Sequence, residues 1–460
     1  MQKVAYGIGG PLDWLTVGLA TTTLWMPVFN IGYGLDPRIL GLLLVLYRIW
    51  DAVADPLMGN ISDNTRSRWG RRRPYVFIGA VLTGMLMPML WHPPTAWGST
   101  GIVIYLAILG LLIFTSFTVW AMPYYSLMLE MTPNYDERTR IAGVRAFFGQ
   151  CSVLVGGWVM AVAAGKWFAN PITGEADLAN GMKTVGIGLS VLVLVIGVLP
   201  ALFVKERYYE VEAKKQEKTK LFQGIKETIS VKPFLMIIGV VVFQVFGMGI
   251  VSNLGQYINI YYISGGELGD AAILEGWKAT AGFTAGVVSI FFWTWVCERL
   301  DKKWALMMIL ACGFIGAALN IYCLTPEYPL LQLVPAVFYA GVIGAMWLIV
   351  PSMMADVADY DEVKTSRRRE GSINAVFSWS MKLGMTLAAG ASGFVLNWTG
   401  FDVAVGKVQP EHVVHRMIIY YILLPIVFWA ISILILWFYP LTRKRMGDIR
   451  TLLEERRGKV

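Results

Sequence analysis

Two acidic residues and one basic residue stand close together in an apolar run from Ile39 to Ile61. Asp51 and Asp55 are four residues apart, so a helix places their carboxylates one turn apart on one face, close to Arg48. In hydrocarbon each such charge costs roughly 2.5–3.5 kcal/mol. Two carboxylates on one face supply oxygen ligands for Na⁺ or Li⁺, or share a proton. We therefore predict a cation site at Asp51 and Asp55. The alternatives are a structural ion pair with Arg48 and an acid kept protonated by burial.

Three more charged residues, Asp13, Arg145 and Lys382, fall inside apolar segments. Asp13 follows a glycine–proline run and either caps a broken helix or accepts hydrogen bonds from the hydroxyls of a polyol ligand. Arg145 lies near a span end, where its side chain can reach the interface, whereas Lys382 lies in mid-span. Together with the first three charges, their insertion cost reaches very roughly 15–21 kcal/mol, so we expect them to line an internal cavity.

The elements that must position these charges are membrane-spanning helices. The chain has 460 residues, 56% of them hydrophobic and only 15% charged, with a mean hydropathy of +0.57, so lipid must cover part of its surface. We predict an all-α membrane protein with twelve spans, at about 7–30, 39–61, 74–97, 101–126, 141–165, 182–204, 233–263, 273–297, 303–323, 329–354, 371–397 and 416–440.

Basic residues are distributed unevenly among the connections. With both termini in the cytoplasm, the inner connections and the C-terminal tail hold 29 of the 39 Lys and Arg, against 6 in the outer connections. This positive-inside bias predicts a multi-pass protein of the cell (inner) membrane with cytoplasmic termini. Basic loops beside an anionic lipid surface account for the net charge of +8, so we expect no nucleic-acid partner.

The two halves of the chain echo each other. Ser126 and a following Tyr135-Asp136-Glu137 recur as Ser352 and Tyr360-Asp361-Glu362, at connections that we expect to be equivalent. A charged stretch separates the halves. We predict a six-helix bundle over 1–204, a cytoplasmic loop over 205–232, a second bundle over 233–440 and a cytoplasmic tail over 441–460. Two six-span repeats with a midplane cavity between them describe the major facilitator fold.

Two motifs resemble a particular family. Arg48-Ile-Trp-Asp-Ala-Val-Ala-Asp-Pro-Leu-Met-Gly, followed by Asp63-Asn-Thr-Arg-Ser-Arg-Trp-Gly-Arg-Arg-Arg-Pro74, is similar to the signature of the glycoside–pentoside–hexuronide:cation symporters, the melibiose-permease-like family. Met354-Ala-Asp356-Val-Ala-Asp359-Tyr360 and the Arg367–Gly371 run resemble it too. The resemblance implies co-transport of a sugar or glycoside with Na⁺, Li⁺ or H⁺.

The resemblance also implies roles for single residues. It places Thr118 beside Asp51 and Asp55 at the cation site. It relates sugar binding to Asp13, Tyr125, Trp347 and Lys382. We add Arg145 to this predicted substrate-binding set.

Two positions depart from the family pattern. Ala54 replaces an amide that ligates the ion, which weakens the case for Na⁺ and leaves H⁺ open. Ala121 replaces a second sugar-binding acid, so we expect a sugar other than an ordinary α-galactoside, with an anionic sugar as the alternative.

Charged residues also gather at the cytoplasmic ends of the spans in both halves. They either form a solvated face or make a gate of ion pairs. We assign this cytoplasmic gate to Asp63, Arg71, Arg138, Asp356, Asp359 and Arg368.

We therefore predict a secondary active transporter that works by alternating access and acts as a monomer in the bilayer. We predict no enzyme activity, no cofactor other than the coupling cation, and no metal other than a Na⁺ ion at Asp51 and Asp55. The alternatives are an uncoupled uniporter or exchanger, a carrier of a lipid-like substrate, and a membrane-embedded receptor or enzyme.

Overall fold

The structure is a computed structural model that describes residues 2–131, 135–204, 206, 229–365 and 370–457. All regular secondary structure in these ranges is helical. Helices satisfy every backbone hydrogen bond within one segment, which apolar surroundings demand because they offer no water.

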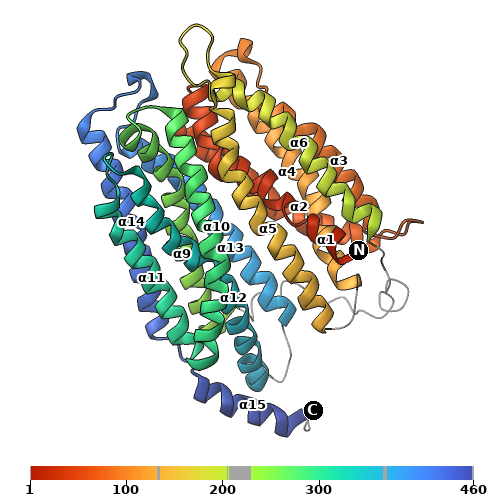
Figure 1. The fold of residues 1–460 in the computed structure, drawn as a ribbon. Coiled ribbons are helices and arrows are strands. Elements are labelled where there is room, and N and C mark those ends of the chain that lie inside the picture. The colour runs from red at the N-terminus through yellow and green to blue at the C-terminus, as the bar shows by residue number, and fades with distance from the viewer. Residues whose placement is uncertain (1, 132–134, 205, 207–228, 366–369, 458–460) are drawn as a thin grey trace. The chain divides into compact units, whose positions relative to one another are not determined.

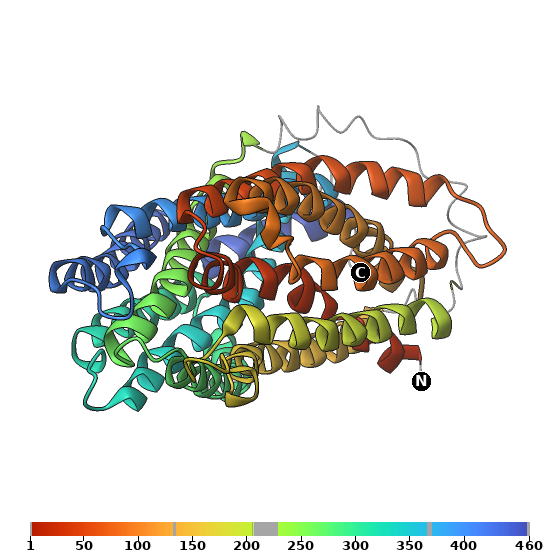
Figure 2. The same ribbon diagram turned by 90° about the horizontal axis from the view of Figure 1, so that it is seen from above.

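The first half consists of long helices that lie alongside one another (Figures 1 and 2). Its longer elements are α1 (Gln2–Ile8), η1 (Trp14–Thr23), η2 (Pro27–Gly32), α2 (Pro37–Asn64), α3 (Arg73–Leu90), α4 (Gly98–Met131), α5 (Tyr135–Ala163) and α6 (Leu178–Phe203). Short 3₁₀ turns at η3 (Thr95–Trp97) and η4 (Lys166–Phe168) precede α4 and α6.

The second half repeats this sequence of helices and adds a terminal one. Its longer elements are α9 (Lys232–Ile258), η5 (Asn259–Ile263), α10 (Leu268–Arg299), α11 (Lys302–Cys323), α12 (Leu333–Thr365), α13 (Glu370–Trp398), α14 (Glu411–Trp437) and α15 (Arg443–Arg457). Short 3₁₀ turns lie at η6 (Pro329–Gln332) and η7 (Val403–Val405).

Within the described ranges, each predicted span coincides with one long helix, apart from the first span, which is divided among α1, η1 and η2, and the seventh, which is α9 followed by η5. In the part of the chain that the structure describes, eight helices are long and apolar enough to cross a membrane by length and composition alone. The α2 helix is not among the eight, and it carries three charges in its central turns, Arg48, Asp51 and Asp55.

One detail of the repeat prediction is wrong. The sequence repeat predicts that the acids from Asp356 to Glu362 lie in a connection, but α12 continues through them to Thr365. The helix extends past the apolar segment because charged residues are compatible with a helical backbone in water. The equivalent Tyr135 likewise begins α5.

The described chain divides into two compact units. Unit 1 contains Met1–Glu217, Ser252–Ala279 and Ala389–Val414, and unit 2 contains Lys218–Val251, Thr280–Ala388 and His415–Val460. Each unit thus includes segments from both halves of the sequence. The sequence repeat predicts a different division, into two six-helix bundles that each come from one half of the sequence. These bundle boundaries stay a prediction.

In unit 1, the contact between α2 and α4 depends on a glycine. Tyr47 is buried, its ring stacks on Phe114 at 5.2 Å, and its hydroxyl donates to the carbonyl oxygen of Leu106 at 2.7 Å. A Cβ atom on Gly110 would lie 2.2 Å from Cζ of Tyr47, so only glycine leaves room for the ring. This contact fixes the register of the two helices, which run in the same direction.

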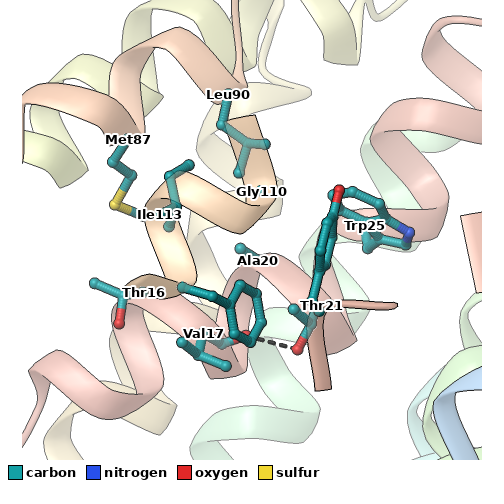
Figure 3. Close-up of a pocket in the computed structure, with 11 residues that line it drawn as sticks. Thr16, Val17, Ala20, Thr21, Trp25, Met87, Leu90, Gly110 and Ile113 are labelled. Carbon is teal, nitrogen blue, oxygen red and sulfur yellow. Dashed lines mark hydrogen bonds between the residues drawn. The ribbon is translucent and has the colours of Figure 1, made fainter. Parts of the chain in front are cut away.

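A small cavity of about 20 Å³ lies beside this contact, between the first span, α2, α3 and α4 (Figure 3). Its volume suffices for about one water molecule. The hydroxyls of Thr16 and Thr21 donate to backbone carbonyls of their own helix, at 2.6 Å each. Because its polar groups are satisfied and its other lining residues are mostly apolar, the cavity is a packing gap.

We predict that Gly110→Ala separates α2 from α4. The new methyl group would overlap the Tyr47 ring, and overpacking of this kind typically costs about 1–3 kcal/mol. The melting temperature of the purified protein should fall, while Gly188→Ala on α6, where a Cβ meets open space, should leave it unchanged or slightly raised. Equal melting temperatures for both variants would contradict the assigned role of Gly110.

Candidate functional site

The two acids of α2 and one hydroxyl of α4 form a compact polar cluster in unit 1. The Oγ1 atom of Thr118 lies 3.2 Å from Oδ1 of Asp51 and 3.2 Å from Oδ1 of Asp55. Thr118 is 1% exposed and Asp51 4%, while Asp55 is half-buried. The predicted meeting of Thr118 with the twin acids is therefore present in the geometry.

The register set by Tyr47 and Gly110 explains this meeting. Asp51 and Asp55 follow Tyr47 by one and two helical turns, and Thr118 follows Gly110 by about two turns. Between these levels, Nε1 of Trp50 donates to the hydroxyl of Thr115 at 2.7 Å. Contacts between side chains thus join α2 to α4 at successive helical turns, from Tyr47 to the two acids.

Arg48 supplies a positive charge next to the first acid. Its Nη1 atom lies 3.9 Å from Oδ2 of Asp51, and its guanidinium carbon lies 5.7 Å from the centre of the Phe114 ring. Two carboxylates and one guanidinium leave a formal charge of −1 when all three are ionised. The cluster therefore has the charge to take up one monovalent cation or one proton.

A second polar cluster joins the first span to α4 and α5. Asp13 accepts hydrogen bonds from the Tyr125 hydroxyl at 2.8 Å and from Nη2 of Arg145 at 2.9 Å. The guanidinium of Arg145 lies 4.8 Å from the centre of the Tyr125 ring. The side chains of Asp13 and Arg145 keep about a third of their surface exposed. The cluster therefore offers a carboxylate, a hydroxyl and a guanidinium beside an aromatic ring.

An aromatic stack supports this second cluster from behind. The Trp120 ring stacks on Tyr124 at 4.3 Å, and Tyr124 stacks on Tyr6 at 4.5 Å and donates to the Tyr6 carbonyl oxygen at 2.7 Å. Gly9 allows this approach, because a Cβ there would lie 2.8 Å from Cε2 of Tyr124. The π-helical turns of η1 begin directly after Asp13, and such turns are frequent at functional sites.

The other two predicted sugar-binding residues belong to unit 2. Lys382 lies on α13 and is half-buried. Trp347 lies on α12, and its side chain is outside the described residues. Their participation in a shared cavity with Asp13 stays a prediction.

The predicted gate residues are described in part. Asp356 is buried on α12 and pairs with Nζ of Lys302 at 2.6 Å, and Asp359 is half-buried one turn later. The backbone N–H of Arg71 donates to Glu206 at 2.8 Å. The other three fall outside the described part of the chain, Arg368 entirely and Asp63 and Arg138 in their side chains.

Several polar partners were not predicted from the sequence. Lys302 lies in a charged stretch that resembles a stretch in the first half of the sequence. This similarity could have identified Lys302 as a partner of a predicted gate residue. Glu206 accepts hydrogen bonds from the backbone N–H groups of Arg71, Arg72 and Arg73 at 2.8, 2.9 and 3.0 Å, which satisfies the amino end of α3. Nothing in the sequence distinguishes Glu206 from its charged neighbours.

Comparison with known proteins shows the family. Residues 6–443 match the model of a family described as MFS/sugar transport protein. The chain belongs to this family. It is a multi-pass membrane transporter, and the predicted all-α major facilitator fold is confirmed.

This transporter is similar to two bacterial relatives. It is 24% identical to the isoprimeverose transporter of Lactiplantibacillus pentosus, covering 97% of this chain and 91% of the relative. It is 25% identical to the putative glycoside/cation symporter YagG of Escherichia coli K12, covering 99% and 95%. Among solved structures, a D-xylose–proton symporter has the same fold, with a TM-score of 0.66 at 15% identity over 96% of this chain and 97% of that one.

The position of Thr118 predicts an effect on cation binding. Thr118→Val removes the hydroxyl shared by Asp51 and Asp55 while it keeps the side-chain volume, so the apparent affinity of the transporter for its coupling ion should fall about tenfold. Thermal stabilisation titrated against Na⁺, Li⁺ and pH measures this affinity. Thr284→Val, whose hydroxyl donates to its own helix at Thr280, is the matched control and should behave as the unmodified protein. Unchanged titrations for Thr118→Val would remove it from the site.

Proposed function

We propose that this transporter is a symporter that couples a monovalent cation, Na⁺, Li⁺ or H⁺, to the uptake of a sugar or glycoside. The observation that carries the proposal is the pair of carboxylates on α2, one buried and one half-buried, that shares the Thr118 hydroxyl. The printed names of its relatives, an isoprimeverose transporter and a putative glycoside/cation symporter, support the same function.

The cation acts first in this proposal. With both acids ionised, Asp51 and Asp55 repel each other, and the guanidinium of Arg48 compensates one of the two charges. A bound cation, or a proton on one carboxylate, neutralises the second. The cluster then has no net charge, which removes the electrostatic penalty for closing apolar walls over it.

The sugar binds at the second cluster. Asp13 is a carboxylate with two donors, Tyr125 and Arg145, that keep its oxygens occupied. Sugar hydroxyls replace these donors on Asp13 with bonds of the same kind, and the aromatic face of Tyr125 packs against a sugar ring. Lys382 and Trp347 from the second half complete the site in the proposal. The carrier then closes on one side of the membrane and opens to the other.

Transport against a gradient is energetically feasible with one ion. One charge moving down a membrane potential of 100 mV releases about 2.3 kcal/mol, enough for roughly 50-fold accumulation. We propose a monomer in the cell (inner) membrane with both termini in the cytoplasm, as the positive-inside bias supports.

An anionic sugar is the second candidate substrate. The guanidinium of Arg145 keeps about a third of its side chain exposed next to Asp13. A sugar carboxylate can take the place of Asp13 on this guanidinium, with the fork geometry that Arg provides. A panel of neutral and acidic sugars, scored by thermal stabilisation, separates the two candidates.

Uptake into energised proteoliposomes tests the coupling. The unmodified protein should accumulate sugar when an ion gradient is imposed, and Asp51→Asn with Asp55→Asn should only equilibrate it, because no carboxylate remains to bind the cation. Asp270→Asn, which neutralises an exposed acid of α10, should accumulate sugar normally. Accumulation by the double variant would exclude symport through these acids, and gradient-independent uptake by the unmodified protein would indicate a uniporter.

A separate substitution tests the sugar site. Asp13→Ala removes the acceptor for sugar hydroxyls, so sugar affinity should fall about 10- to 100-fold while cation-induced stabilisation persists. Binding of labelled sugar in the presence of each cation measures it, with Asp270→Ala as the control. Parallel loss of sugar and cation binding would mean that Asp13 holds the fold rather than the ligand.

A further inference from the structure

Three connections of unit 1 meet at one lysine. Nζ of Lys407 lies 2.9 Å from Oε1 of Glu175 and 3.0 Å from Oε1 of Glu267. Glu175 lies between α5 and α6, Glu267 between η5 and α10, and Lys407 between α13 and α14. Each of these connections follows an odd-numbered span, so all three lie on the membrane face opposite the N-terminus. The hydrogen bonds to Glu175 and Glu267 raise the pKa of Lys407 above its ordinary value, so it stays charged.

A buried hydrogen bond lies on the membrane side of this cluster. The Tyr257 hydroxyl donates to Oδ1 of Asn30 at 2.8 Å, and Nδ2 of Asn30 donates to the carbonyl oxygen of Leu35 at 2.7 Å. Asn30 is 3% exposed and Tyr257 1%. The Tyr257 ring packs edge-on against Phe401, at 4.9 Å between ring centres. The first span, the seventh span and the last connection are therefore joined at one point.

Glycines allow the backbones to approach in the same region. A Cβ on Gly41 of α2 would lie 2.9 Å from the carbonyl oxygen of Gly390 on α13, and a Cβ on Gly393 would lie 2.3 Å from that of Pro37. A Cβ on Gly266 would lie 2.6 Å from Cβ of Lys407. The backbones therefore pack closely in this region. The buried Asn30–Tyr257 bond and the exposed ion pairs of Lys407 are the polar contacts beside them.

We propose that the Asn30–Tyr257 hydrogen bond and the ion pairs of Lys407 with Glu175 and Glu267 form a lock that closes the outer face of the carrier. The proposal rests on the proposed transport function, because only a carrier needs this face to close and reopen. We call this set of contacts the outer lock. It shares no residue with the predicted cytoplasmic gate, and every member of it belongs to unit 1.

The kinds of bond suit a contact that must break in every cycle. The carboxylates of Glu175 and Glu267 are more than half exposed, and exposed ion pairs are weak and screened by salt. The Asn30–Tyr257 bond is shielded from water, and opening exchanges it for bonds to water, so its net contribution is modest. The outer lock therefore biases the carrier toward closure without fixing it there.

Distances between spin labels test the outer lock. Ile172 and Val408 are 91% and 79% exposed, in two of the three connections. With the four native cysteines replaced by alanine, cysteines at these positions carry the labels in lipid nanodiscs. Tyr257→Phe combined with Lys407→Gln should raise the ratio of long to short label distances about fivefold, the factor expected for a lost buried hydrogen bond.

The matched control combines Tyr261→Phe with Arg38→Gln. Tyr261 packs on the same Phe401 ring, and Arg38 pairs with Asp36 at the amino end of α2, so neither change breaks the outer lock. The control should keep the distances of the unmodified protein. Lys407→Glu should lengthen them, and adding Glu267→Lys should restore them.

The same distances in the lock variant and in the unmodified protein, with folding verified by melting temperature, would overturn the proposal, and so would equal lengthening in the control. The measurement needs neither sugar nor cation. A failure of the proposed symport would appear in the uptake experiment and leave this result standing.

Discussion

The high cost of a charge in hydrocarbon governs the organisation of this transporter. An ionised side chain inside a span must face a partner, water or a ligand, because lipid offers it nothing. Two acids of the first half, Asp51 and Asp13, meet this demand in the same way. Asp51 has Arg48 and the Thr118 hydroxyl, whereas Asp13 has Arg145 and the Tyr125 hydroxyl. Each of these two acids thus contacts a guanidinium and a hydroxyl, in an arrangement whose bonds a ligand can replace one at a time.

These partners meet because packing between helices sets their heights. The Tyr47 ring in the space left by Gly110 aligns α2 with α4, and the acids and Thr118 follow at whole turns below it. At the second cluster, Gly9 lets the first span approach Tyr124, next to the residue that binds Asp13. In both places a large aromatic ring packs against a glycine, and this contact sets the height of the polar groups beside it.

The sequence predicts what depends on composition and local spacing. The twelve spans follow from apolar length, and the shared face of Asp51 and Asp55 follows from their four-residue separation. The pairing of Asp13 with Arg145 spans 132 positions, and no local pattern encodes it. Thr118 was found only because the motif resembles a family, since a hydroxyl in a span is otherwise unremarkable. The helix end at Thr365 was missed because hydropathy reports where lipid ends, not where the helix ends.

The two kinds of polar contact in unit 1 differ in what breaks them. In the proposed function, a carboxylate oxygen of Asp13 or of the twin acids holds its donor until a sugar hydroxyl or a cation competes for it. At the Asn30–Tyr257 bond and the Lys407 ion pairs, only water competes, and water offers an equivalent bond as soon as the helices separate. Binding at the first set can therefore change the balance at the second without touching it, provided that ligand binding favours one packing of the helices over the other.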